Sequence, residues 1–69
     1  MAEIDLQTVD KALLRFRQER SAENAEYADY VLSKLRLMLG ERFDSLHYYV
    51  SAHREVVDFL ENERRKTNG

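Results

Sequence analysis

The sequence predicts an all-α fold, a small helical bundle formed by one domain that spans residues 1–69. Among its 69 residues there is no proline and only two glycines, at positions 40 and 69, while Ala, Leu, Glu, Arg and Lys are abundant. These residue types favour helix. Large apolar residues also recur at alternating intervals of three and four, which places them on one face of a helix. We therefore expect helices near 6–20, 22–39 and 44–66, and no strands.

The first helix is predicted from a single apolar face. Residues 17–26 follow it without one large apolar side chain, so we expect a break or kink at 20–24, with Ser21 as the N-cap of the next helix. The alternative is one continuous helix over 5–39, roughly 50 Å long. Such a helix would need a partner chain to cover its N-terminal apolar face, whose residues are Leu6, Val9, Leu13 and Phe16.

The second helix is predicted to end at Gly40, because glycine adopts the positive φ angle that commonly ends a helix. A short connection favours antiparallel neighbours, so the second and third helices should form an antiparallel hairpin that turns at Gly40. Tyr30 and Leu37 lie seven residues apart and give this helix a second apolar line. The first apolar face consists of Ala28, Val31, Leu35 and Met38.

The third helix carries two apolar stripes, and together they are too wide for one neighbouring helix to cover. We expect Asp44 to be its N-cap, with Phe43 packing on Tyr48 across the cap. The sequence does not decide which stripe lies inside the subunit. One stripe consists of Leu46, Val50, His53, Val57 and Leu60, and the other of Tyr49, Ala52, Val56 and Phe59.

A homodimer is predicted from this excess of apolar surface and from the size of the chain. A domain of this length buries only ~60% of the surface that its unfolded chain exposes, and without cysteine no disulfide can compensate. We expect the dimer seam to use one stripe of the third helix. The predicted seam residues are Leu46, Val50, His53, Val57 and Leu60, and the neighbouring stripe is the alternative.

Catalysis, cofactor binding and metal binding are not expected. There is no cysteine, and no serine has a glycine-rich elbow beside it. His47 and His53 are six residues apart, so on a helix they point in different directions and cannot share a metal ion. A chain this short also has hardly enough interior for a concave pocket. We predict a protein that is not an enzyme.

Nucleic-acid binding is the alternative function, and the charge argues against it. Lys and Arg number 11 against 13 Asp and Glu, for a net charge of −2, whereas binding to phosphates calls for a clearly basic face. The order helix, Gly40, helix is that of a helix-turn-helix, but Arg36 occupies the position where that motif packs a small residue. A dimeric nucleic-acid-binding regulator would have to use Lys11, Arg15, Arg17 and Arg20.

The function predicted first is that of a small regulatory protein that docks onto a larger protein as an inhibitor, anti-activator or adaptor. Antitoxins and phage-encoded inhibitors are often chains of this size and class. No stretch approaches the ~18 apolar residues of a membrane span, and the acidic start does not match a signal peptide, so we expect no membrane association and a cytoplasmic location. Aromatic and aliphatic anchors at helical spacing suit such docking. The predicted anchors are Tyr30, Leu37, Tyr48, Tyr49 and Phe59.

Overall fold

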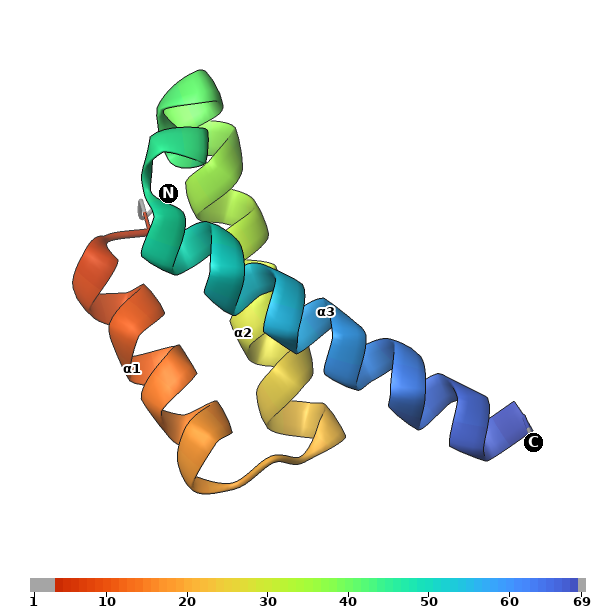
Figure 1. The fold of residues 1–69 in the computed structure, drawn as a ribbon. Coiled ribbons are helices and arrows are strands. Elements are labelled where there is room, and N and C mark those ends of the chain that lie inside the picture. Colours follow the sequence, from red (N-terminus) through yellow and green to blue (C-terminus); the bar gives the residue numbers. More distant parts are fainter. Residues whose placement is uncertain (1–3, 69) are drawn as a thin grey trace.

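The computed structural model describes residues 4–68, and these form a helical bundle without a strand. α1 and α2 pack against each other, and α3 runs back across α2 (Figure 1). The predicted all-α fold is confirmed, although residues 1–3 and 69 of the predicted domain lie outside the described part. In chain order the elements are α1 (Leu6–Gln18), α2 (Ala22–Leu39), the 3-10 helix η1 (Gly40–Ser45) and α3 (His47–Asn68).

The chain breaks between α1 and α2, as predicted, and the alternative of one continuous helix is excluded. The break lies at 19–21, and α1 ends two residues earlier than predicted. Ser21 is the N-cap of α2, where its Oγ accepts a hydrogen bond from the Asn24 backbone N–H at 3.2 Å. Asp5 caps α1 in the same way, and the 2.8 Å bond that its Oδ1 accepts from the Thr8 backbone N–H lowers the Asp5 pKa.

The turn at Gly40 is confirmed, but the start of the third helix was predicted wrongly. Gly40 has a φ of 60°, a positive value that glycine adopts readily because it has no Cβ. Asp44 is not an N-cap, because residues 40–45 form η1 and α3 begins three residues later than expected. The physical reason is Phe43, which η1 turns into the core, where it is 2% exposed. Its ring packs edge-on against His53 and not on Tyr48.

The core is formed by one face of each helix together with Phe43. On α3 the stripe that packs deepest contains Ala52 and Val56, which are 3% and 0% exposed, and its other two members, Tyr49 and Phe59, are half-buried. The other stripe is half-buried, and His53 within it contacts Asp29 of α2. Both stripes of α3 therefore pack within one chain. The remaining core residues are Val9, Ala12, Leu13, Phe16, Ala25, Ala28, Val31, Leu32 and Leu35.

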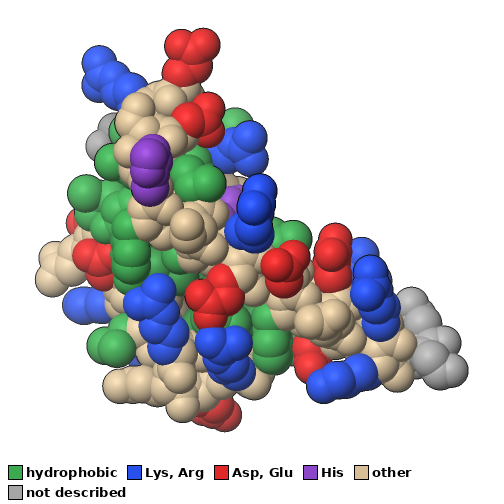
Figure 2. All heavy atoms as spheres, in the orientation of Figure 1, with side chains coloured by type: hydrophobic (Ala, Val, Ile, Leu, Met, Phe, Trp, Pro, Cys, Tyr) green, Lys and Arg blue, Asp and Glu red, His purple; other side chains and the backbone are tan. Residues whose placement is uncertain are grey.

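The C-terminal part of α3 extends beyond α1 and α2 and gives the protein an elongated shape (Figure 1). Acidic and basic side chains are mixed over this projecting part (Figure 2). None of the helices among residues 4–68 combines the length and the apolar character that crossing a bilayer requires.

Candidate functional site

The outer face of α2 carries four large apolar side chains that remain about half exposed or more. Tyr27, Tyr30 and Met38 are 48%, 54% and 47% exposed, and Leu37 is 81% exposed. Tyr30 and Leu37 lie on the side of α2 away from its buried residues, and Tyr27 and Met38 lie between that side and the buried face. Lys34 lies among them, with its Nζ 5.7 Å from the centre of the Tyr30 ring. We call Tyr27, Tyr30, Leu37 and Met38 the α2 apolar surface.

The five predicted anchor residues do not form one surface. Tyr30 and Leu37 belong to the α2 apolar surface, whereas the other three lie on α3 and face α1. The hydroxyl of Tyr49 donates a 2.8 Å hydrogen bond to Asp10 Oδ1. Phe59 is half-buried, with its ring 5.3 Å from that of Phe16 and nearly perpendicular to it. Tyr48 is 52% exposed and packs edge-on against the ring of Tyr49.

Tyr49 has a structural contact, and its ionisation reflects this. Burial and, after it, the hydrogen bond to the Asp10 carboxylate together raise the pKa of its phenol to about 12. The cause is that a phenolate would lose hydration and stand beside a second negative charge. Tyr49 therefore holds α3 against α1 in its neutral form.

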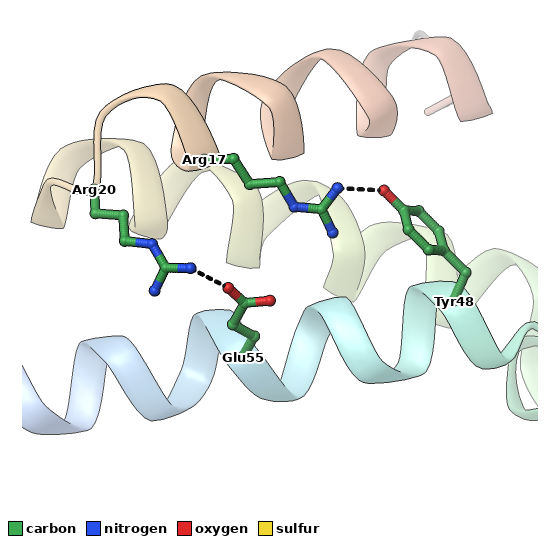
Figure 3. A network of polar contacts seen from close by, with 4 residues as sticks. All are labelled: Arg17, Arg20, Tyr48 and Glu55. Atoms are coloured by element: carbon green, nitrogen blue, oxygen red, sulfur yellow. Dashed lines mark hydrogen bonds and ion pairs between the residues drawn. The ribbon is translucent and has the colours of Figure 1, made fainter.

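The four basic residues predicted for nucleic-acid binding divide into two pairs, and one pair fastens α1 and its C-terminal end to α3 (Figure 3). Arg17 Nη1 donates a hydrogen bond to the Tyr48 hydroxyl at 2.7 Å. Arg20 Nη2 makes an ion pair with Glu55 Oε2 at 2.5 Å, and its guanidinium also lies 5.2 Å from the centre of the Phe16 ring. These two arginines are engaged within the chain.

The other pair, Lys11 and Arg15, lies on a different side of α1. Within residues 4–68 neither side chain makes a hydrogen bond or an ion pair. Both line a groove of about 350 Å³ between α1 and α2, with Tyr27 on the opposite wall. We call this the α1/α2 groove; it is lined by Thr8, Lys11, Ala12, Arg15 and Tyr27. Tyr27 also belongs to the α2 apolar surface, so the groove and that surface adjoin.

The two histidines occupy different environments. His53 is half-buried between α2 and α3, and its Nε2 lies 2.8 Å from Asp29 Oδ1. His47 is exposed at the start of α3. Among the described residues no three His, Asp or Glu side chains lie close enough together to hold a metal ion. The contact of His53 with Asp29 thus joins two helices of the bundle.

The prediction from sequence did not include Tyr27 and Met38 among the binding residues. The sequence does contain a signal for Tyr27. The positions of Tyr27, Tyr30, Lys34 and Leu37 are separated by three, four and three residues, which places them on one helix face. Met38 had been assigned to the buried face of its helix. It is exposed because α1 and α3 cover only part of α2 near its C-terminal end.

Comparison with models of known protein families gave no match to this chain. Comparisons with curated proteins and with solved structures gave no match either.

Proposed function

We propose that this chain is a small non-enzymatic regulatory protein that binds a larger protein through the α2 apolar surface, as an inhibitor, anti-activator or adaptor. The observation that carries the proposal is the exposure of four neighbouring large apolar side chains on one helix face. A contiguous apolar area on a small protein often marks an interaction site. Tyrosine in particular is common among the residues that contribute most to binding.

The geometry supports docking by a helix face. Tyr30 and Leu37 are two turns apart, so they suit a partner groove that accepts side chains at intervals of three, four and seven residues. Leu37 is the most exposed of the large apolar side chains of the described chain, at 81%. Most of the Leu37 side chain is therefore not packed against other parts of the bundle. We infer that Leu37 is the central anchor, with Tyr30 beside it.

The alternative function, nucleic-acid binding, has less support. Arg17 and Arg20 are held by Tyr48 and Glu55, so only Lys11 and Arg15 of the four predicted contacts are left for phosphates. Affinity for a phosphate backbone depends on the number of such contacts. Two cations beside an apolar surface suit a protein partner better.

Two further parts of the proposal concern assembly and location. We propose that the chain forms a homodimer through the predicted seam, which consists of Leu46 and four residues of α3. These residues are half-buried and so keep part of their surface for a second chain. We also propose that it acts in the cytoplasm. Because this seam does not include the α2 apolar surface, that surface would stay accessible to the larger partner in the dimer.

Site-specific photo-crosslinking in the native host tests the proposal. A photoreactive amino acid at Leu37 should give one discrete crosslinked protein, whereas the same group at the exposed Asn62 of α3 should not. A competitor chain with Tyr30→Ser and Leu37→Ser should fold, because both side chains are exposed. When added in excess, it should not reduce the yield of the crosslinked product, whereas the unmodified chain should. Equal crosslinking from both positions, or full competition by the double variant, would contradict the proposed surface.

A further inference from the structure

We propose that the α1/α2 groove binds an acidic amphipathic helix of the partner protein, with partner carboxylates on Lys11 and Arg15 and partner apolar side chains over Tyr27. This inference rests on the proposed function, since it states the chemistry of the partner segment. It is carried by the juxtaposition of two cations, a groove and an exposed aromatic ring.

The two cations have no counter-charge bonded to them within the described chain. Lys11 and Arg15 are one helical turn apart, at the spacing where like charges on a helix repel each other. Lys11 interacts with Asp5 only by charge attraction at a distance, and this attraction is the smallest of the effects on the Asp5 pKa. Glu19 lies one turn beyond Arg15 and lines a neighbouring hollow together with it, but the two side chains form no ion pair. A carboxylate placed between Lys11 and Arg15 would relieve this repulsion.

Other basic side chains of the protein show the contrast. Arg20 is paired with Glu55 and Lys66 with Glu63, at 2.5 and 3.3 Å. Arg17 is hydrogen-bonded to Tyr48. Arg36, Arg54 and Arg64 also form no hydrogen bond or ion pair within the described residues, but the hollows that they line contain Asp or Glu side chains. The α1/α2 groove is lined by Lys11 and Arg15 and by no acidic side chain of residues 4–68, and it lies next to the α2 apolar surface. Arginine can hold a carboxylate with two parallel hydrogen bonds, so Arg15 also gives the site a preferred geometry.

The apolar part of the site decides between an acidic protein segment and a simple anion. Tyr27 forms one wall of the groove and is 48% exposed. Lys34 adds a third positive charge near the Tyr30 ring. A phosphate or a nucleic-acid backbone would contact the cations and leave these rings in water. An amphipathic helix with acidic and apolar side chains would cover both features, which is the usual mode of helix binding in a groove.

The test uses a fluorescently labelled synthetic helix with Glu on one side and Leu and Phe on the other. Its binding to the full chain is measured by anisotropy over a salt series. The same residues in scrambled order, without an apolar face, and a version with Lys for Glu serve as control peptides. We expect binding of the acidic amphipathic peptide alone, weakened by salt. Amide chemical-shift changes should map the peptide to Lys11, Arg15 and Tyr27.

Matched charge variants then locate the site. Lys11→Gln with Arg15→Gln should weaken binding about tenfold, the effect of losing two exposed charge pairs. Arg64→Gln with Arg65→Gln makes the same change in net charge on the projecting part of α3 and should leave the affinity within about twofold. Thermal unfolding verifies that each variant folds. If a double variant does not fold, binding is measured with its two single variants.

Three outcomes would overturn the inference. Equal binding of the scrambled peptide would mean that charge alone attracts it. Tighter binding of a single-stranded oligonucleotide at the same residues would indicate nucleic acid as the ligand. Absence of peptide binding would refute the partner chemistry, while a crosslink from Leu37 would still support the proposed function. Conversely, binding of the peptide without a crosslink from Leu37 would support the inferred partner chemistry and count against the proposed docking through the α2 apolar surface.

Discussion

Replacing Val56 or Val57 with alanine tests which side of α3 faces the core. The two valines are adjacent in sequence, so both substitutions make the same small gain in helix propensity, up to ~0.6 kcal/mol. Val56 is 0% exposed and lies in the core with Ala52, whereas Val57 is half-buried beside a surface hollow. A difference in stability between the two variants therefore reports packing.

The expected magnitude follows from what each substitution removes. Val→Ala deletes two methyl groups, worth roughly 0.8 kcal/mol each in transfer from water, and a rigid site adds the cost of a cavity. Val56→Ala should lower the free energy of unfolding by about 2 kcal/mol after the gain in propensity. Val57→Ala should lower it by under about 1 kcal/mol, because solvent already reaches the side chain.

Urea unfolding followed by circular dichroism measures both variants against the parent protein. In a domain of this size a loss of 1 kcal/mol also lowers the melting temperature by about 4–8 °C, so the two variants should be separable by heat as well. An equal loss in both variants, or a larger loss for Val57→Ala, would refute the orientation of α3 and the packing drawn from it.

Three other predictions follow from the turn, the helix contacts and the assembly. Gly40→Ala should destabilise the protein by about 1–3 kcal/mol through backbone strain at φ 60°, since no atom lies within 4 Å of the added Cβ; an unchanged urea midpoint would contradict this. The pKa of Tyr49 is about 12 in the folded chain against 10.0 for an unperturbed tyrosine, so the stability that its neutral form contributes is complete below pH 10 and is lost as the pH rises through 12. Tyr49→Phe should remove that high-pH step from the tyrosinate absorbance titration. Sedimentation at micromolar concentration should detect a homodimer, whereas an 8.2 kDa monomer with a melting temperature independent of concentration would count against it.

The positions of α1 and α2 could be predicted from local signals alone. Asp5 and Ser21 cap their helices through their own side chains, and Gly40 has no Cβ to oppose a positive φ. These effects reach only a few residues along the chain, which is why the bounds of α2 were predicted correctly. The start of α3 was missed because the position of Phe43 depends on a core contact with His53, a residue ten positions away.

The candidate site could be predicted only in part, for the same reason. Tyr30 and Leu37 were recognised as a second apolar line because helical spacing shows which residues share a face. Tyr49 and Phe59 are also large apolar residues that share a face of their helix, α3, yet they pack against Asp10 and Phe16 of α1. Spacing places side chains on a helix face, but it does not say whether another helix covers that face.

The sequence by itself determined that the chain is helical, where α2 begins and ends, and that the net charge is slightly negative, because propensity, capping and composition act locally or sum over the chain. Only the tertiary structure decided which basic residues of the N-terminal segment are engaged. Arg17 and Arg20 find their partners on α3, more than 30 residues away, while Lys11 and Arg15 are left beside Tyr27. The physical reason is that contacts between helices depend on how the helices cross, and no spacing within one helix encodes that crossing.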